Sequence, residues 1–239
     1  MEGVYVMKIS KHLYKSSGVE YGTNSNTFLL DIGEELIAFD LGYEDKQWKA
    51  MQETMRYWNL NKKISRAFLT HGHYDHAGNT YKANEEGIRV YCGDPDASKI
   101  ENGYPEMEKL FGRKWICARV DERLKDGQVF DFNQAKVEVY SAAGHSEGSF
   151  AFVAETDGHR ALITGDMFYV RPLPPHDDIE LELAYMGGED FDLDSFIATL
   201  EKMAILHCDI LLPGHYYVYY GDIDELCRKA AAMARALKE

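Results

Sequence analysis

The sequence lacks long apolar runs and has few positive charges. No stretch reaches the ~18 apolar residues that a membrane-spanning helix needs, and the first eight residues lack the basic and apolar regions of a signal peptide. We therefore expect a cytoplasmic protein with no membrane partner. Only 26 basic residues stand against 40 acidic ones, and the formal net charge of −14 would repel a polyanion, so nucleic acid is not an expected partner.

Cysteine is also scarce. The chain has four cysteines, none in a Cys-x-x-Cys pair, and they stand among apolar neighbours. We expect reduced, buried or half-buried thiols rather than metal ligands. The sequence also shows no convincing triad around a Ser or Cys nucleophile. A chain of 239 residues with 45% hydrophobic residues can nevertheless bury a substantial core, as one large domain or two small ones.

Histidine, in contrast, is concentrated in one short stretch. His71, His73, Asp75 and His76 lie within six residues, directly after the apolar run 67–69. Imidazole and carboxylate groups suit Zn, Fe or Mn. At the end of an extended strand, His71 and His73 would point to the same side because they are two residues apart. Asp75 and His76 would follow at the strand-to-helix corner, where they could face a second ion.

Three more polar residues stand where predicted strands end. His145, Asp166 and His215 each directly follow a glycine, which lets the backbone turn sharply and present the next side chain at the sheet edge. Beside an incomplete metal cluster, each is an expected further ligand. Asp40 ends another apolar strand just before Gly42, and the pattern there is equally consistent with a turn residue and with a site residue.

The rest of the chain combines apolar strands with amphipathic helices. Strands are expected at 26–31, 36–41, 64–70, 88–92, 115–120, 128–132, 135–140, 149–154, 160–164 and 209–213, and helices at 44–60, 77–86, 193–207 and 222–238. The alternating strands from residue 115 onward, with Asp-Gly turns, predict a second and mainly antiparallel sheet.

Two segments fall outside this pattern. Residues 94–114 are polar and interrupted by glycine and proline, which predicts an insertion of short helices. Residues 168–189 contain Pro172, Pro174, Pro175, His176 and a Gly-Gly pair, and they begin two residues after Asp166. This composition predicts an irregular loop that faces the substrate.

With these motifs the chain closely resembles the metallo-β-lactamase fold superfamily of hydrolases, over nearly its whole length. Asp40 matches the first motif, the cluster at 71–76 the second, and His145, Asp166 and His215 the third to fifth. The resemblance implies an α+β fold, a four-layer αββα sandwich formed as a single domain over residues 1–239. It places the metals in a cleft at one edge of the sheets.

The resemblance also implies a role for each matched residue. One ion would take His71, His73 and His145, the other would take Asp75, His76 and His215, and Asp166 would bridge them. Asp40 would lie behind the ligands and orient one of them. Two cations close together acidify a shared water to a bridging hydroxide and polarise the carbonyl or phosphoryl group that it attacks. Two divalent ions are thus the expected cofactor, Zn first, with Fe or Mn as alternatives.

Branches of the superfamily differ at positions that can be compared. Many true β-lactamases carry Cys or Ser in place of Asp166, and flavodiiron proteins carry Glu in place of His73. Glyoxalase II enzymes share all seven ligands but add a helical extension that binds glutathione, whereas 24 residues follow His215 here. The net charge disfavours the tRNA-processing branch. N-acyl homoserine lactonases have a tyrosine three residues after the bridging Asp, as Tyr169 does here, and that tyrosine hydrogen-bonds the attacked carbonyl.

The leading expectation is therefore a dinuclear hydrolase of a small ester, thioester or lactone, with a small-molecule substrate and Asp75, Asp166 and Tyr169 as catalytic residues. Because the chain has 16 tyrosines, the sequence alone slightly favours a packing or loop role for Tyr169 over a role as donor to the carbonyl. The alternatives are a β-lactam or phosphodiester hydrolase, and a mononuclear iron sulfur dioxygenase that would use the positions of His71, His145 and Asp166. A metal-holding binding module without turnover is a further alternative.

Overall fold

The apolar runs on either side of Gly33 form adjacent antiparallel strands in the first of two large sheets. The computed structural model describes residues 7–18, 24–173 and 178–238. The first sheet has seven strands in chain order: β1 (Met7–Lys8), β2 (Leu13–Ser17), β3 (Thr27–Asp31), β4 (Leu36–Phe39), β5 (Ile64–Phe68), β6 (Arg89–Cys92) and β7 (Glu122–Arg123). Strands β4 to β7 pair in parallel.

The alternating segments after residue 115 form the second sheet. Its six strands are, in spatial order, β15 (Tyr219–Tyr220), β14 (Ile210–Pro213), β11 (His159–Gly165), β10 (Phe150–Thr156), β9 (Ala135–Ser141) and β8 (Val129–Phe132). All neighbours pair antiparallel except β11 and β14, which are parallel. The predicted antiparallel character is thus confirmed, although residues 115–120 pair with no described strand and the short β7 follows them.

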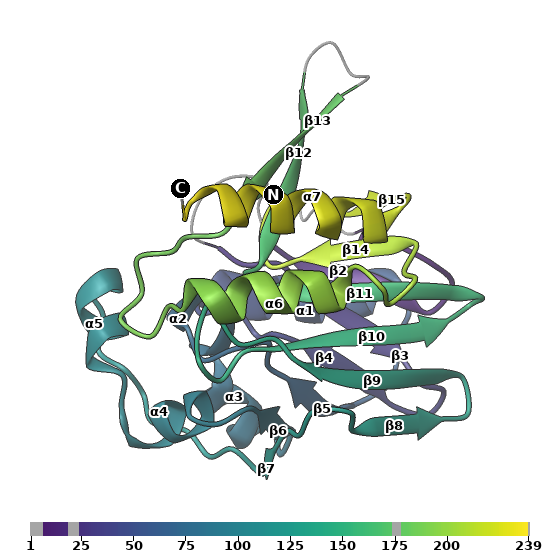
Figure 1. Ribbon diagram of the computed structural model, residues 1–239. Coiled ribbons are helices and arrows are strands. Elements are labelled where there is room, and N and C mark those ends of the chain that lie inside the picture. The colour runs from purple at the N-terminus through teal and green to yellow at the C-terminus, as the bar shows by residue number, and fades with distance from the viewer. Residues whose placement is uncertain (1–6, 19–23, 174–177, 239) are drawn as a thin grey trace.

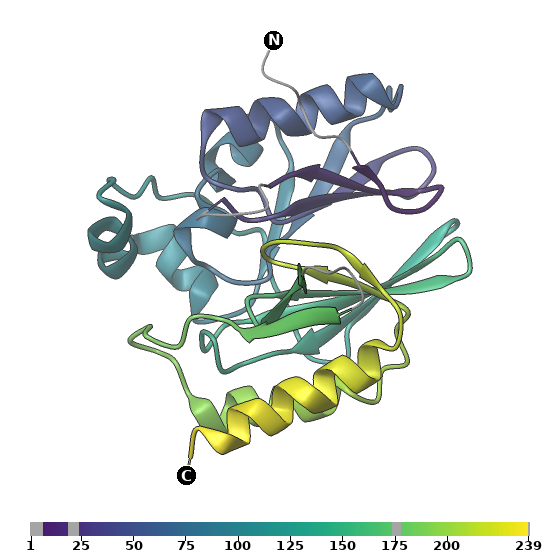
Figure 2. The ribbon, with the colours of Figure 1, turned by 90° about the horizontal axis from the view of Figure 1, so that it is seen from above.

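Helices cover the outer face of each sheet (Figures 1 and 2). The described helices are α1 (Asp45–Tyr57), α2 (Tyr74–Ala77), α3 (Thr80–Glu85), α4 (Asp96–Asn102), α5 (Pro105–Phe111), α6 (Leu193–Met203) and α7 (Ile223–Ala236). The helix expected at 77–86 is divided into α2 and α3, whereas α4 and α5 confirm the short-helix insertion at 94–114. No helix in the described ranges is long and apolar enough to cross a membrane.

Three buried clusters separate the four layers. In β3, Leu29 packs toward α1, whereas Phe28 and Leu30 pack toward the other sheet. In β10, Phe152 faces the first sheet and Val153 faces α6 and α7. Successive side chains of a strand point to opposite faces, so strands that are covered on both sides read as continuous apolar runs. The predicted α+β, four-layer αββα sandwich is confirmed, while its extent as a single domain over residues 1–239 stays a prediction.

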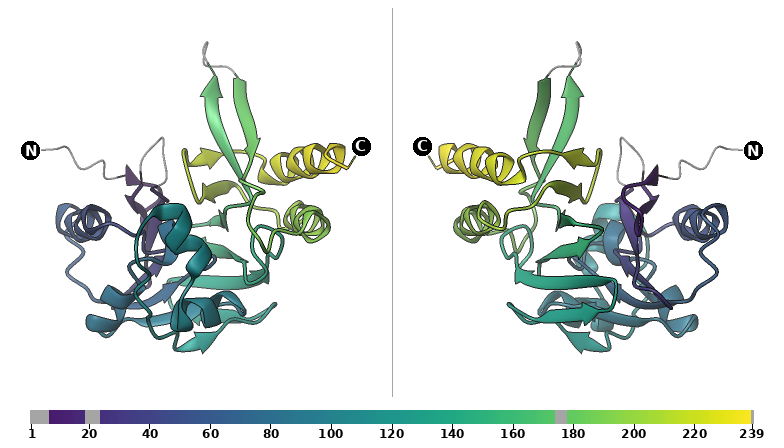
Figure 3. Two further views of the ribbon diagram at one scale, coloured as in Figure 1. Left: turned by 90° about the vertical axis from the view of Figure 1, so that its left-hand side faces the viewer. Right: turned by 90° about the vertical axis from the view of Figure 1, so that its right-hand side faces the viewer.

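The expectation of an irregular loop over residues 168–189 is wrong for much of that segment. β12 (Phe168–Leu173) and β13 (Asp178–Leu183) form an antiparallel hairpin that stands out from the body of the protein (Figure 3). Pro172 fits within β12 because that strand pairs on one side only, so the missing N–H can face away from the ladder. Pro174, Pro175 and His176 lie outside the described residues.

Candidate metal centre

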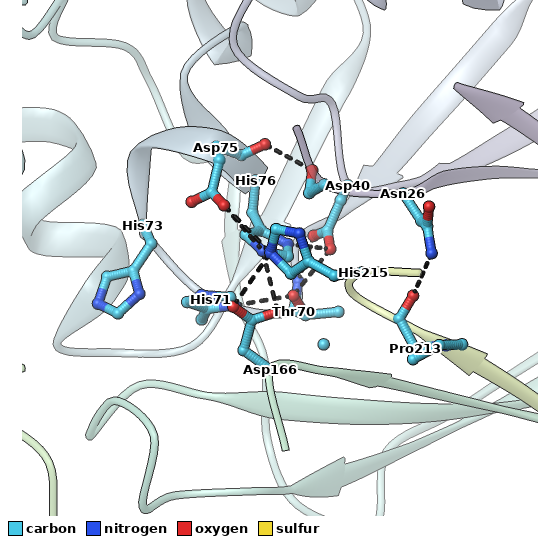
Figure 4. A network of polar contacts seen from close by, with 12 residues as sticks. Asn26, Asp40, Thr70, His71, His73, Asp75, His76, Asp166, Pro213 and His215 are labelled. Atoms are coloured by element: carbon cyan, nitrogen blue, oxygen red, sulfur yellow. Dashed lines mark hydrogen bonds and ion pairs between the residues drawn. The ribbon is translucent and has the colours of Figure 1, made fainter. Parts of the chain in front are cut away.

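The site lies where parallel strands of both sheets end. Phe39 of β4 pairs with Phe68 of β5, and the next residues of the two segments lead to Asp40 and to the 71–76 cluster. In the second sheet β11 and β14 run parallel to their ends at Gly165 and Pro213. Carboxyl ends of parallel strands meet at one edge of a sheet, which is a common place for ligand sites in open sheets. Figure 4 shows the polar side chains of this edge converging from both sheets.

Two of the glycines that precede site residues are required by the backbone. The backbone φ angle is +136° at Gly144 and +53° at Gly165. Residues other than glycine seldom adopt these positive values. A Cβ on Gly144 would also collide with the backbone of Phe196 in α6. The glycine signal before His145 and Asp166 therefore has the conformational cause that the sequence suggested.

His71, His73 and His145, here called the first ligand group, come together from both halves of the sandwich. Their ring centroids lie 4.6 to 4.8 Å apart, and His73 Nδ1 lies 3.0 Å from His145 Nε2. Nitrogens that share a tetrahedral zinc ion at bond lengths of about 2.0–2.1 Å lie about 3.3 Å apart. This spacing therefore suits two ligands of one ion.

Asp75, His76, Asp166 and His215, here called the second ligand group, lie beside the first. His215 Nε2 is 3.2 Å from Asp75 Oδ2 and 3.4 Å from Asp166 Oδ2. His76 Nε2 is 3.1 Å from Asp166 Oδ1. One ligand atom from each residue can be chosen so that all lie within 4.8 Å of one another, and the same holds in the first group.

Asp166 lies between the two groups. Its Oδ2 is 3.7 Å from Nε2 of His145 in the first group, and its Oδ1 approaches His76 in the second. A carboxylate in this place can contact two ions at once and offset the repulsion between them.

Several site atoms are buried without a hydrogen-bond partner among the described residues. They are Nε2 of His71, His73 and His76, and Oδ1 of Asp166. His76 Nε2 is close to Asp166 Oδ1, but the pair does not meet hydrogen-bond geometry, so it is an electrostatic contact. Orphaned buried polar atoms are costly. Cations would satisfy those that face the centre, so the residues present fit divalent metal ions.

The two groups differ in their protonation. Burial lowers the pKa of His71 well below its usual value and also lowers that of His73, and it brings the pKa of His145 down to about 4, helped in each ring by a neighbouring histidine. Desolvation disfavours the charged imidazolium. These three rings are therefore neutral, which is the form that coordinates a metal ion.

Carboxylates reverse this effect in the second group. Burial alone would lower the pKa of His76 and His215, but Asp166 and Asp75 outweigh it, so the pKa of His76 rises well above its usual value and that of His215 rises to about 9. Burial likewise opposes the charge of Asp166, yet His76 and His215 hold its pKa well below the usual range. The second group is thus a network of alternating charges.

Asp40 lies behind the ligands, where the sequence resemblance placed it. Its Oδ1 accepts a hydrogen bond from Thr70 N, and its Oδ2 accepts one from Thr70 Oγ1 and lies 2.8 Å from His76 Nδ1. Thr70 Oγ1 in turn lies 3.0 Å from His71 Nδ1. One carboxylate therefore orients His76 directly and His71 through Thr70 (Figure 4).

Tyr169 is buried in β12 beside the second ligand group. Its ring centroid is 5.3 Å from that of His215 and 5.4 Å from that of Tyr216. Burial and the Asp166 carboxylate raise its pKa well above the usual value, so its hydroxyl is a neutral donor. The structure thus brings Tyr169 to the site, together with all seven expected ligands.

Sequence reasoning did not identify every residue that holds the site. His145 Nδ1 lies 3.1 Å from the backbone carbonyl oxygen of Tyr185, just after β13. The buried ring of Tyr104 lies 6.0 Å from His73. Every residue has a backbone carbonyl, so the sequence carries no signal for the role of Tyr185. Tyr104 lies in the insertion 94–114, where the sequence predicts short helices but no site residue.

Residues 21–215 match the sequence profile of the Metallo-beta-lactamase superfamily. The chain therefore belongs to this superfamily, and the resemblance that its motifs indicated is confirmed.

Curated relatives resemble the chain over most of its length. An atrochrysone carboxyl ACP thioesterase of Pseudocercospora fijiensis is 27% identical over 192 residues, covering 80% of this chain and 47% of the relative. Thioesterase pkgB of Emericella nidulans is 28% identical over 193 residues, covering 80% and 45%. The atrochrysone carboxyl ACP thioesterase dmxR1 of a Cryptosporiopsis species is 28% identical and covers 90% and 58%. The chain thus spans about half the length of these relatives.

Solved structures share the fold. A motif mutant of the metallo-beta-lactamase from Cronobacter sakazakii superposes with a TM-score of 0.73 at 15% identity, covering 98% of this chain and 96% of that one. A metallo-beta-lactamase family protein from Thermus thermophilus gives a TM-score of 0.71 at 19% identity, with 96% and 81% covered. At these identities the likeness concerns the fold alone.

Proposed function

We propose that the protein is a dinuclear metal-dependent hydrolase whose preferred substrate is a small thioester, with esters and lactones as related substrates. The observation that carries this proposal is the pair of ligand groups that share Asp166. The choice of thioesters rests on the relatives, which are named thioesterases and match 80% of this chain or more.

Each ion has its own ligands in this proposal. The first ligand group would hold one ion and Asp75, His76 and His215 the other, with Asp166 as a ligand available to both. When bound, the two ions supply a water acidic enough to attack at neutral pH and a Lewis acid for the carbonyl oxygen. Zn is the proposed metal, with Fe or Mn as alternatives, because histidine and carboxylate sites accept several first-row ions.

The remaining catalytic work falls to protein groups near the ions. Tyr169 would donate a hydrogen bond to the carbonyl oxygen as negative charge develops on it. Hydrolysis adds a hydroxyl group to the acyl carbon, breaks the C–S bond and leaves the proton to the departing sulfur. Asp75 is an ionised carboxylate, because His76 and His215 lower its pKa against the effect of burial. It would accept this proton and pass it to the sulfur.

We also propose a cytoplasmic location.

The test is a substrate panel with the full chain loaded with Zn, Mn or Fe. Acyl thioesters, lactones, carboxylic esters, a β-lactam and bis-p-nitrophenyl phosphate are compared by kcat/KM. We expect thioesters to be hydrolysed fastest, with lactones and esters slower. Turnover of the phosphodiester alone would overturn the bond class. Oxygen consumption with a persulfide by protein holding one Fe per chain would instead establish the sulfur dioxygenase alternative.

A further inference from the structure

Asp96, the first residue of α4, is a carboxylate with no exposed surface. Lys99 Nζ lies 4.0 Å from its Oδ1 and pairs with Asp190 at 2.6 Å instead. Burial raises the pKa of Asp96. A carboxylate that loses its water is costly unless hydrogen bonds replace that water. The bonds that Asp96 accepts must therefore offset this cost, and their partners indicate its role.

Those bonds come from two separate loops. Asp96 Oδ2 accepts from Gly72 N at 2.7 Å and from Ser146 Oγ at 2.6 Å, and Oδ1 accepts from Gly148 N at 3.3 Å. Ser146 Oγ also lies 2.7 Å from Ser149 Oγ within its own loop. One buried side chain thus joins the loop after β5 in the first sheet to the loop after β9 in the second.

Both loops carry the first ligand group. Gly72 stands between His71 and His73, and Ser146 directly follows His145. The ring nitrogens of His73 and His145 that would share an ion are 3.0 Å apart. Their separation depends on how the two sheets are held together at this point, and Asp96 forms a hydrogen-bonded link between the two loops there.

The backbones of Gly72 and Gly148 also pack closely against the Asp96 side chain. A Cβ on Gly72 would come within 3.0 Å of Asp96 Cβ, and a Cβ on Gly148 within 2.7 Å of Asp96 Cγ. Glycine at these two positions lets both backbones approach the carboxylate. This contact is independent of the hydrogen bonds and leads to the same conclusion.

Asp96 and Asp40 differ in what they hold. Asp40 contacts His76 itself, whereas the bonds that Asp96 accepts come from backbone and hydroxyl groups beside the ligands. We propose that Asp96 is a positioning residue that sets the spacing between His73 and His145 and thereby the affinity of the first ligand group for its ion. This inference rests on the proposed metal centre but not on the choice of substrate.

The experiment measures metal affinity rather than activity. Wild-type protein and the Asp96→Asn and Asp96→Ala variants are stripped of metal and titrated with Co²⁺, whose visible absorption reports the coordination of each ion. We expect two binding steps in the wild type. In both variants the step of the first ligand group should weaken by roughly 10–100-fold, the usual effect of losing a group that orients ligands. Its absorption bands should also shift, while the other step keeps its affinity within about threefold.

Two further variants separate positioning from folding. Ser146→Ala removes one of the hydrogen bonds without changing the charge, and should weaken the same step by less than Asp96→Ala. Asp94→Asn is the matched control, because Asp94 lies two residues away, has a half-exposed side chain and pairs with Arg123 at the surface. Its titration should match that of the wild type. If the Asp96 variants do not fold, the Ser146→Ala titration still tests the positioning role: a weaker first-group step supports it and an unchanged step contradicts it.

The outcomes separate the inference from the proposed function. Wild-type affinity at both steps in Ser146→Ala and in the folded Asp96 variants would overturn the positioning role, as would equal losses at both steps. A wild-type chain that binds no Co²⁺ would overturn the metal centre and the inference with it. A wild type that binds two ions but hydrolyses no thioester would overturn the proposed substrate and leave the role of Asp96 standing.

Discussion

The two ligand groups lie side by side, yet they place very different charges around an ion. The first is made of three neutral imidazoles, whereas the second contains two carboxylates that alternate with histidines. An ion in the first group would keep most of its positive charge, because the three imidazoles are neutral. Among the ligands proposed for this ion only Asp166, which lies between the two ligand groups, is negative. Similar ligand spacing can thus produce a more electrophilic ion and a more neutralised one at a single sheet edge.

Removal of both ions should have the largest effect. We expect dialysis against a chelator to abolish hydrolysis, and re-addition of metal to restore it with two ions per chain, measured by elemental analysis. Ligands that bind only the folded state stabilise it by about 2.7 kcal/mol at a concentration 100 times their Kd. Two such ions give about 5.4 kcal/mol, so for a chain of this size the Tm should fall by roughly 10–20 °C on stripping. Full activity with one ion per chain would show that the two groups do not act together.

Asp166→Asn should have the second largest effect, because this carboxylate lies between the two ligand groups. Loss of a charged bridge removes several kcal/mol of stabilisation from the reacting centre, and each 1.4 kcal/mol is a factor of ten in rate, so kcat/KM should fall by at least about 10³-fold. The metal content should fall in both groups. Asp209→Asn is the control, since Asp209 is half exposed and pairs with His159. A loss confined to one ion would contradict a shared ligand.

Tyr169→Phe tests the chemistry beside the second group while the ring packing against His215 and Tyr216 is kept. Loss of one donor to a developing oxyanion should lower kcat by about 100-fold with metal content unchanged. Tyr220→Phe is the control, because its hydroxyl bonds to the carbonyl of Ile9. Wild-type kcat in Tyr169→Phe would make this tyrosine a packing residue.

Asp40→Asn should have a smaller effect that is unequal between the groups. His76 loses its direct acceptor, whereas His71 is affected only through Thr70. We expect Co²⁺ affinity to fall by roughly 10–100-fold in the second group and by less in the first, the reverse of the order expected for Asp96→Asn. Asp45→Asn, at an exposed ion pair with Lys82, should bind as the wild type does. Equal losses of Co²⁺ affinity in both ligand groups would contradict the different roles given to Asp40 and Asp96.

Much of this site could be predicted because its signals are local. The 71–76 cluster is contiguous, and His145, Asp166 and His215 each follow a glycine at a strand end. Short sequence patterns are therefore sufficient to identify all seven expected ligands. Sheet pairing added what those patterns could not show, namely that the parallel strands β4 and β5 and the parallel strands β11 and β14 end at one edge.

Other features had no readable signal or had a misleading one. Tyr185 acts through its backbone carbonyl, which every residue has. Asp96 belongs to no motif in the polar segment 94–114, and only the folded chain brings Gly72 and Ser146 to it. The prolines near residue 172 suggested irregular structure, but a hairpin strand with an open side accommodates one.

The division of ligands between the two halves has a consequence for chain topology. Each group takes two residues from the segment 71–76 and completes its set from residues far along the chain. A bound ion that joins His76 to His215 would close a loop of ~140 residues, and one that joins His73 to His145 would close a shorter loop that overlaps the first, each with the entropic cost of a long closure. The two ions would thus act as interleaved cross-links, both of which an unfolding chain would have to release before its sheets could separate.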